Sequence, residues 1–586
     1  MVYDAPIRDM AFALESMARF ARVEENGAFE NYDSDLILPI LEEAGKLARD
    51  VLAPLNQAGD KAGATLGPDG VIAAPGFKEA YAAYRDGGWI GLGFPEAWGG
   101  QGLPKGLALA VMEIVNGANM AFGLCPMLSL GAIEALLAHG SDAQKQIYLP
   151  KLVSGEWTGT MNLTEPQAGS DVGALKSKAV PNDDGSYAIT GQKIFITWGD
   201  HDVAENIVHL VLARLPDAPA GSRGVSLFIA PKFLVNEDGS LGQRNRVKCI
   251  GLEEKLGIHA SPTCVMEFDG ATAWLVGEAN RGLAAMFTMM NSARLNVGLE
   301  GVGIGEAAYQ TALTYARERK QGKAEGVDGN APIIHHPDIR RTLVTMRART
   351  MAARAICYAC GVAADLAEHG PEEGREAAKL REDLLTPVAK AWSTDMGVEV
   401  ASMGVQVHGG MGFMNETLAA QLYKDARIAP IYEGTNGIQA MDLVGRKLSM
   451  GNGIAMRAML EDISETALEA RQSNEPDFVA IADHLDAAAA ALEETTGWMI
   501  EAMKDNRSVA LGGATAYLAL AGDVIGGHFL ARGALAARGD DTRPEMLALA
   551  AFFAETDLAE APARVPGIIG GGDVLARFGD AVLGEA

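Results

Sequence analysis

The sequence predicts a mainly α-helical protein with a central β-domain and an additional helical domain at its C-terminal end. Residues 157–278 contain β-branched runs bounded by turn residues, such as YAITGQKIFIT and GVSLFIAP. The segments on both sides carry apolar residues at helical spacing. Beyond Gly451-Asn452-Gly453, the best linker in the chain, residues 454–586 are Ala-rich and helical in pattern.

The first part of the chain is expected to be helical. Residues 1–35 form an N-terminal arm, and residues 36–157 form an N-terminal helical domain. In the arm, the short helical pattern lies at Met10, Leu14, Met17 and Phe20. In the domain, we expect a helix over 35–52 that Pro54 ends, and then helices over 107–116, 129–139 and 142–152.

The middle and C-terminal parts follow the same reasoning. Residues 158–280 form the β-domain, in which Asp184-Gly185 predicts a hairpin turn between two strands. Residues 281–450 form a helical bundle, with helices expected over 283–320, 335–360, 376–404 and 437–449. The extra domain covers 454–586 and is expected to end in a Gly-rich tail, VPGIIGGGD.

The composition limits the function classes. Among 586 residues, 49 Lys and Arg against 76 Asp and Glu leave a formal charge of −27. Such a surface repels nucleic acid and anionic membranes, so neither is expected as a partner. No unbroken run of about 18 apolar residues appears, and no transmembrane helix is expected. Five scattered cysteines indicate a reducing cytoplasm and no disulfide framework.

Several common sites are absent from the sequence or weak in it. Gly301–Gly305 has alternating glycines but lies in a helical pattern, which favours close helix packing over phosphate binding. The CxxC at Cys357 and Cys360 has no second pair, and His335-His336 has no carboxylate cluster around it. No metal site is therefore expected. No GxxxxGK[ST] occurs, which disfavours a P-loop protein, and no GxSxG occurs, which disfavours a serine hydrolase.

Three segments carry residues suited to chemistry. They are MNLTEPQAGSDV at 161–172, KIFITW at 193–198, and QVHGGMGF at 406–413 with IYEGTNGIQ at 431–439. Taken singly, each fits a turn, a strand or a Gly-rich loop as well as a site. Their joint order and spacing remove this ambiguity.

Together these segments resemble the acyl-CoA dehydrogenase family over about residues 35–450. TEPQAGSDV is similar to the family's flavin-binding motif, KIFIT to its second flavin-contacting strand, and the last two segments to its C-terminal signatures. ARERK at 316–320 is similar to the helix end that reaches a neighbouring subunit's FAD. The arm and the extra domain resemble a longer bacterial subfamily that includes 3-methylmercaptopropionyl-CoA and fatty acyl-CoA dehydrogenases.

The resemblance implies a site for FAD and for an acyl-CoA. It makes Glu433 the base that removes the α-proton, and a carboxyl suits this role if burial raises its pKa. Its neighbours Ile431, Tyr432 and Gly434 predict an apolar, compact surrounding. Implied FAD contacts are Met161, Leu163, Thr164, Gly169, Ser170, Phe195, Ile196, Thr197, Arg319, Gln321, Gln406, Gly409, Gly410, Gly434, Thr435 and Asn436. Implied acyl-CoA contacts are Ser170, Asn291, Arg294, Glu433 and Gly434.

Some positions depart from the family pattern. Met161 stands where an aromatic residue is common, and Phe195 stands where Trp is common. Gly322 replaces the usual Phe after the ARERK segment, and Gly437 replaces a Gln found in some relatives. These departures leave the local FAD contacts open.

The function that the resemblance implies is α,β-dehydrogenation of an acyl-CoA, with electrons passed to an electron-transfer flavoprotein. A short acyl group is expected, 3-methylmercaptopropionyl-CoA first, with straight-chain fatty acyl-CoAs as the alternative. An acyl-CoA oxidase and a non-enzymatic DNA-associated flavoprotein of the same fold are further alternatives; the charge of −27 and an intact Glu433 oppose the latter. Because Arg319 and Gln406–Gly410 would serve a neighbouring subunit, a homodimer or dimer of dimers is expected.

Overall fold

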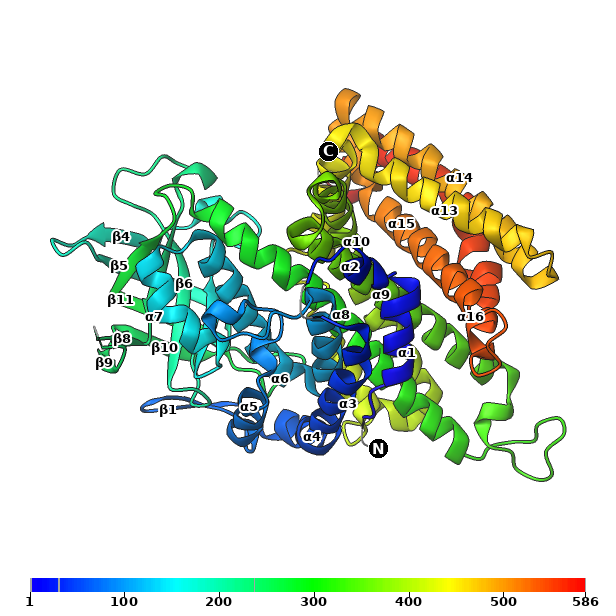
Figure 1. Ribbon diagram of the computed structural model, residues 1–586, viewed down its shortest axis with the longest axis horizontal. Coiled ribbons are helices and arrows are strands. Elements are labelled where there is room, and N and C mark those ends of the chain that lie inside the picture. The colour runs from blue at the N-terminus through cyan, green and yellow to red at the C-terminus, as the bar shows by residue number, and fades with distance from the viewer. Residues whose placement is uncertain (1–2, 30–31, 237, 585–586) are drawn as a thin grey trace.

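A computed structural model describes residues 3–29, 32–236 and 238–584. It confirms the predicted fold class: helices precede and follow a central β-domain, and a further set of helices ends the chain. In Figure 1 the β-domain lies on the left, the long helices α8, α9 and α10 cross the centre, and the C-terminal helices lie at the upper right. The bundle is therefore in contact with both other parts.

The N-terminal arm is part of the core. Met10, Leu14, Met17 and Phe20, the residues of the predicted helical pattern, are all almost wholly buried. Arg532 of the extra domain donates from Nη1 to the carbonyl of Met17 at 2.9 Å. The arm thus joins the beginning of the chain to its end. Its elements are α1 (Ile7–Phe12), the π-turn Ala13–Met17 and α2 (Ala21–Glu25).

Two helix boundaries in the N-terminal domain were predicted wrongly. Pro54 does not end a helix, because it lies in the first turn of α4, directly after the wide π-turn Ala48–Leu52. The expected break over 117–128 is reduced to one non-helical residue, Asn119, within α6, which runs from Lys105 to His139. It kinks at Asn119, whose side chain accepts from the backbone N–H of Phe122 and donates to the carbonyl of Leu52.

The remaining elements of this domain are four helices of 10 to 12 residues, two short strands and three 3₁₀ turns. They are the 3₁₀ turn Ser34–Leu36, α3 (Ile37–Leu47), α4 (Ala53–Ala62), β1 (Thr65–Gly67), β2 (Gly70–Ile72), α5 (Phe77–Asp86), the 3₁₀ turns Trp89–Gly91 and Glu96–Trp98, and α7 (Asp142–Val153).

The β-domain is built on a seven-stranded sheet. Its strand order is β3-β6-β7-β11-β5-β4, with β10 paired to β11, and only β3 and β6 are parallel. The hairpin predicted at Asp184-Gly185 is confirmed: β4 and β5 pair antiparallel, and Gly185 has a φ of 83°. The strands are β3 (Trp157–Asn162), β4 (Lys178–Pro181), β5 (Tyr187–Thr197), β6 (Asn206–Ala213), β7 (Ser226–Pro231), β8 (Phe233–Val235), β9 (Leu241–Arg244), β10 (Val247–Leu252) and β11 (Thr263–Val276).

The bundle is held by close contacts between its long helices. A Cβ added at Gly301 of α8 would lie 2.2 Å from the Ser393 carbonyl oxygen of α10, and one at Gly303 would lie 2.7 Å from the backbone nitrogen of Gly117 in α6. The prediction that these glycines permit helix packing is confirmed. The elements are α8 (Gly282–Glu318), the 3₁₀ turn Ile333–His335, α9 (Pro337–His369), α10 (Glu372–His408), the 3₁₀ turn Gly409–Phe413, α11 (Leu418–Ala426) and α12 (Asn436–Gly445).

The extra domain begins where the glycine pattern predicts a break. Gly451, Asn452 and Gly453 all have positive φ, between 55° and 77°, so no α-helix continues through them. The expected Gly-rich tail is wrong, however, because residues 565–573 lie within α17. A Cβ at Gly572 would lie 2.0 Å from the Val509 carbonyl oxygen, so this glycine allows α17 to pack on α15. The helices are α13 (Ile454–Gln472), α14 (Pro476–Asp505), α15 (Arg507–Ala536), α16 (Pro544–Thr556) and α17 (Ala561–Leu583).

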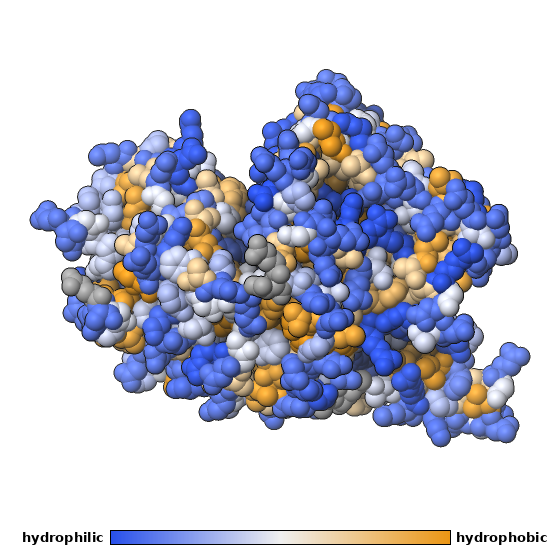
Figure 2. Space-filling model, in the orientation of Figure 1, coloured by the Kyte–Doolittle hydropathy of each residue, from blue (hydrophilic) through white to orange (hydrophobic). Residues whose placement is uncertain are grey.

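Three helices, α6, α9 and α15, are long and apolar enough to cross a membrane by length and composition. Within the protein, 83%, 89% and 72% of their most apolar windows are buried, so packing accounts for their hydrophobic character. The requirement for an unbroken apolar run did not detect α6, because Asn116 and Asn119 interrupt it. The face of the molecule seen in Figure 2 is largely hydrophilic, with scattered apolar patches.

Candidate active site

Glu433 lies in the loop between α11 and α12, in an unusual backbone conformation. Its φ is 56° and that of Gly434 is 84°, so two consecutive residues are left-handed. The carbonyl oxygen of Glu433 accepts from Nε of Arg294 and from Nε2 of Gln439, both at 3.3 Å. These contacts offset the cost of the left-handed conformation and leave the carboxyl group without a hydrogen bond to any described residue.

The residues after Glu433 are held by α10. Lys390 donates from Nζ to the carbonyl oxygen of Gly434 at 3.0 Å and to Oδ1 of Asn436 at 2.8 Å. Nδ2 of Asn436 donates to Oδ1 of Asp395 at 2.8 Å. The amide of Asn436 is thus used within the protein. Thr435 caps α12 by accepting from the backbone N–H of Ile438, at a helix N-terminus suited to an anion.

Burial raises the pKa of Glu433 to about 7, and the positive charges of Arg294 and Lys390 oppose that rise. The expected increase in pKa therefore agrees with the structure, but the expected apolar surrounding does not. Ile431 is 51% exposed, and the groups nearest the base are charged. They come from α8 and α10, far from Glu433 in sequence.

Two buried ionisable residues of this site were missed by sequence analysis. Glu300 of α8 is wholly buried and accepts a hydrogen bond from the hydroxyl of Tyr432, the neighbour of Glu433. Lys390 of α10 is equally buried. The available signal was a charged residue inside an apolar stretch, in VGLEGVG and in PVAKAW. Such residues are rarely buried without a partner.

The first predicted flavin segments do come together. The loop after β3 lies beside β5, since the backbone N–H of Ile194 donates to the Thr164 carbonyl oxygen at 2.9 Å. A buried ion pair between Lys193 and Glu165, at 2.8 Å, also joins the two segments. Thr164 and Thr197 are half-buried, and their hydroxyls form no hydrogen bond within the described chain. Met161, Leu163, Phe195 and Ile196 lie in the same two segments.

Gly169 and Ser170 follow on an exposed turn of the same domain. Both residues are exposed, and a Cβ added at Gly169 would meet no atom within 4 Å. Phe195 is 58% exposed and has a φ of 60°. The two strand ends therefore present free hydroxyls, an aromatic ring and an open turn, a set of groups that fits a large cofactor with a ring and phosphates.

The other predicted cofactor residues lie at the opposite end of the bundle. Tyr315 of α8 and His408 of α10 stack with ring centroids 4.4 Å apart, which brings the ends of these helices together. There Arg319, Gln321, Gln406, Gly409 and Gly410 are all exposed. The 37 residues of α8 span about 55 Å, and its first turn packs on the β-domain. The two sets therefore do not meet within one chain.

Asn291 and Arg294, the predicted CoA contacts, lie on α8 beside Glu433. Nη1 of Arg294 donates to Oδ1 of Asn291 at 3.4 Å. Arg294 is only 5% exposed, so it is not a solvated surface charge. In the structure it holds the backbone of Glu433.

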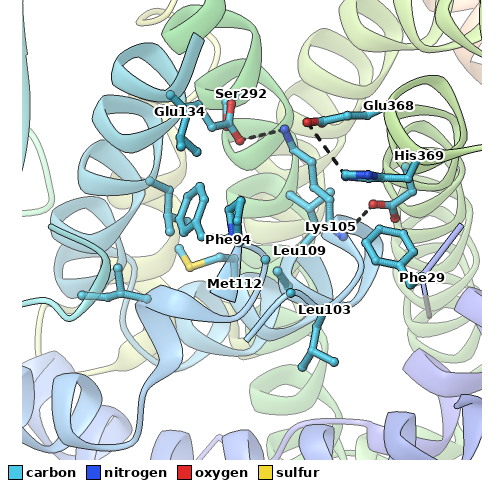
Figure 3. A pocket seen from close by; sticks show the side chains of 18 of the residues that line it. Phe29, Phe94, Leu103, Lys105, Leu109, Met112, Glu134, Ser292, Glu368 and His369 are labelled. Atoms are coloured by element: carbon cyan, nitrogen blue, oxygen red, sulfur yellow. Dashed lines mark hydrogen bonds and ion pairs between the residues drawn. The ribbon is translucent and has the colours of Figure 1, made fainter. Parts of the chain in front are cut away.

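A large cavity lies elsewhere in the described chain. It has a volume of about 530 Å³, and Figure 3 shows Phe29, Phe94, Leu103 and Met112 around it. Lys105 forms an ion pair with Glu134 at 2.8 Å on its wall. None of the predicted site residues lines this cavity, so size alone does not locate the chemistry.

Comparison with known proteins supports one family. Three family profiles match in chain order: acyl-CoA dehydrogenase N-terminal domain at 39–156, middle domain at 160–271 and C-terminal domain at 280–449. A fourth, described as acetyl-CoA dehydrogenase C-terminal like, matches residues 458–578 of the extra domain.

Two relatives and one solved structure extend over nearly the whole chain. The chain is 48% identical to 3-methylmercaptopropionyl-CoA dehydrogenase of Ruegeria pomeroyi, over 98% of this chain and 99% of that protein. It is 35% identical to the broad-specificity linear acyl-CoA dehydrogenase FadE5 of Mycobacterium tuberculosis, over 95% of both. Caenorhabditis elegans ACDH-11, solved with C11-CoA, shares the fold with a TM-score of 0.79 at 21% identity, over 98% of this chain and 95% of that one. By these full-length similarities the chain belongs to the acyl-CoA dehydrogenase family.

Proposed function

We propose that this FAD-dependent acyl-CoA dehydrogenase oxidises a short acyl-CoA thioester, with 3-methylmercaptopropionyl-CoA as its preferred substrate. The observation that carries the proposal is the 48% identity to the Ruegeria enzyme over both full chains. The relative at 35% identity is named for linear acyl-CoAs, which makes straight-chain substrates the alternative. Only the α and β carbons react, so a sulfur at the γ position is compatible with the same chemistry.

Glu433 is proposed as the base. Formation of the trans-2-enoyl product removes a proton from the α-carbon and a hydride from the β-carbon. A carboxyl whose pKa burial has raised to about 7 is a stronger base than an exposed glutamate and is still about half ionised at neutral pH. Arg294 and Gln439 support this role by fixing the backbone from which the carboxyl projects.

The same loop offers donors for the thioester oxygen. As the α-proton leaves, negative charge develops on this oxygen, and backbone N–H groups aimed at it stabilise the transition state. The N–H of Glu433 donates to no described residue, and Gly434 has no side chain to obstruct an approaching carbonyl. Lys390 keeps this turn in place through the Gly434 carbonyl.

FAD, when bound, supplies the acceptor for the β-hydride. In this proposal the hydroxyls of Thr164 and Thr197 and the open turn at Gly169 and Ser170 hold it from one chain. Gly434, Thr435 and Asn436 approach it from the Glu433 loop. Met161, Leu163, Phe195 and Ile196 complete this set. Arg319, Gln321, Gln406, Gly409 and Gly410 would contact the FAD of a neighbouring subunit.

A homodimer, or a dimer of dimers, is part of the proposal. Its support is the length of α8, which keeps Arg319 about 55 Å from the β-domain of the same chain. Next to Gly409 and Gly410 lie exposed apolar side chains, with Phe413 86% and Met411 50% exposed. A second copy would cover these side chains. An electron-transfer flavoprotein is proposed as the electron acceptor.

Steady-state turnover tests the substrate. We expect 3-methylmercaptopropionyl-CoA to have a higher kcat/KM than butyryl-CoA and octanoyl-CoA, with an artificial electron acceptor. If octanoyl-CoA is preferred by tenfold or more, about 1.4 kcal/mol of transition-state stabilisation, the short-acyl assignment fails. Bleaching of the flavin without peroxide release in air would separate a dehydrogenase from an oxidase.

A further inference from the structure

A second carboxyl lies behind the proposed base. Glu300 is wholly buried on α8; its Oε2 accepts from the Tyr432 hydroxyl, and its Oε1 has no partner among the described residues. On both sides of Glu300 along α8, the backbones of α8 and α10 are in close contact. A Cβ at Gly298 would lie 2.6 Å from the Ala389 carbonyl oxygen, and one at Gly301 would lie 2.2 Å from that of Ser393. A buried carboxyl with a free oxygen is costly and calls for an explanation.

Glu300 connects directly to the left-handed turn. Tyr432 immediately precedes Glu433, so the Glu300–Tyr432 hydrogen bond holds the start of this turn. Arg294 and Lys390 hold its middle and its end, through the carbonyl oxygens of Glu433 and Gly434. Three residues from two helices therefore hydrogen-bond to three consecutive residues of the loop.

The ionisable groups that face Glu300 come from every element packed against it. The loop contributes Tyr432 and Glu433, and α10 contributes Lys390. Arg294 of α8 and Asp395 of α10 act in turn on Lys390. Burial raises the pKa of Glu300 to about 8; Tyr432 and Lys390 oppose this rise and Glu433 adds to it. Burial also lowers the pKa of Lys390 to about 8. Groups this close with overlapping pKa values lose their protons as a coupled set.

We propose that Glu300 is a positioning residue for Glu433, which holds Tyr432 and places a second ionisable carboxyl against the base. This inference rests on the proposed role of Glu433. While Glu300 is neutral, it adds no charge to the site. When Glu300 ionises, its negative charge opposes the ionised form of Glu433, so Glu433 becomes a stronger base. The proton from the substrate α-carbon still goes to Glu433 alone.

The test is the pH profile of kcat/KM between pH 6 and 10. The native protein is expected to show two ionisations, one near neutrality and one at higher pH. Glu300→Gln keeps an oxygen that accepts from Tyr432 but cannot ionise, so its upper step is expected to shrink to the part that Lys390 contributes. Its plateau above pH 9 is expected to be about threefold lower, because the base is weaker.

A second variant changes the stability of the Glu300 charge without changing the Glu300 side chain. Tyr432→Phe keeps the ring and the Glu300 carboxyl but removes the hydroxyl that stabilises its charged form. The upper ionisation is therefore expected to move to higher pH, while FAD content and circular dichroism stay native. This result decides the matter if Glu300→Gln fails to fold.

An unchanged two-step profile in Glu300→Gln, or an upper ionisation that does not move in Tyr432→Phe, would overturn the inference. The proposed function has a separate test in Glu433→Gln. If that variant is inactive while Glu300→Gln keeps the native profile, the base assignment stands and only the role of Glu300 is wrong.

Discussion

The two parts of the predicted cofactor and substrate site differ in how completely one chain builds them. The Glu433 loop, residues 431–436, receives hydrogen bonds from α8 and from α10, and its side-chain amide at Asn436 is satisfied. The predicted contact residues of the segment 406–414 and Arg319 are exposed, and they lie at the end of the bundle away from the first turn of α8, which packs on the β-domain. The first part is held within one chain, whereas the second would contact the FAD of another copy in the proposed dimer.

This difference follows from what each part must do. A base has to be held within a fraction of an ångström of the reacting carbon, which favours many contacts inside one rigid chain. A cofactor has to be enclosed on several sides, and a second subunit can provide that enclosure. The single helix α8 serves both parts, with Arg294 in its first half, Glu300 at its middle and Arg319 just beyond its C-terminal end.

The largest expected effect is in the Glu433 loop, residues 431–436. Glu433→Gln should lower kcat by about 10²–10⁴-fold, because a general base contributes that much, and should leave FAD bound. Stopped-flow bleaching of the flavin and its absorption spectrum measure the two quantities. Glu373→Gln, an exposed carboxyl on α10, is the matched control and should behave as the native protein. Native turnover in Glu433→Gln would contradict the mechanism.

Hydrogen bonds that anchor the Glu433 loop to α10 can be removed by substituting Asn436. Asn436→Ala leaves Lys390 and Asp395 without their amide partner and is expected to lower the free energy of unfolding by about 2–4 kcal/mol. Denaturant unfolding measures this loss. The control is Asn330→Ala in an exposed loop, for which no change is expected. Equal stability of the two variants would mean that the loop is held by other contacts.

The exposed part of the predicted site, at Arg319 and residues 406–414, is tested by Arg319→Ala. This variant should weaken FAD binding about 10–100-fold through loss of a charge-assisted hydrogen bond. Flavin fluorescence on dilution measures it, with Arg317→Ala as the control.

A mixture of two variants tests whether Glu433 and Arg319 belong to sites in different copies. If Glu433 and Arg319 serve sites in different copies, a dimer of one Glu433→Gln chain and one Arg319→Ala chain contains one intact site. Refolding the two variants together should therefore restore activity. No recovery would show that both residues act on the same chain's site.

The smallest expected effects depend on pH. Since the folded pKa of Glu433 is about 7, kcat/KM should rise as pH increases through 7. The folded carboxyl holds its proton more tightly than the unfolded one. Its unfavourable contribution to stability is therefore absent at low pH and grows from about pH 4.5 to 7. Glu433→Gln should thus melt at a higher temperature than the native protein at pH 8, and this difference should vanish near pH 4.5. A difference independent of pH would contradict the raised pKa.

Local features of this fold were readable in the sequence because neighbouring residues encode them. The hairpin at Asp184-Gly185 and the break at Gly451–Gly453 depend on residues that accept positive φ, and both lie where predicted. Long helices and strands followed from periods of 3.6 and 2. The errors over 117–128 and in the Gly-rich tail have one cause: packing of a helix against distant neighbours outweighed a local breaking signal. Pro54 was misread for a local reason, because the first turn of a helix tolerates proline.

The sequence by itself determined the order of the domains, the family resemblance and the position of Glu433, since these depend on residues that are adjacent or in motifs. Only the tertiary structure decided what surrounds Glu433. Glu300 and Lys390 are 133 and 43 positions away from it along the chain, and their approach depends on how closely α8 and α10 pack. Burial and charge act through space rather than along the chain, so the pKa of a base can be assigned only once its neighbours in the fold are known.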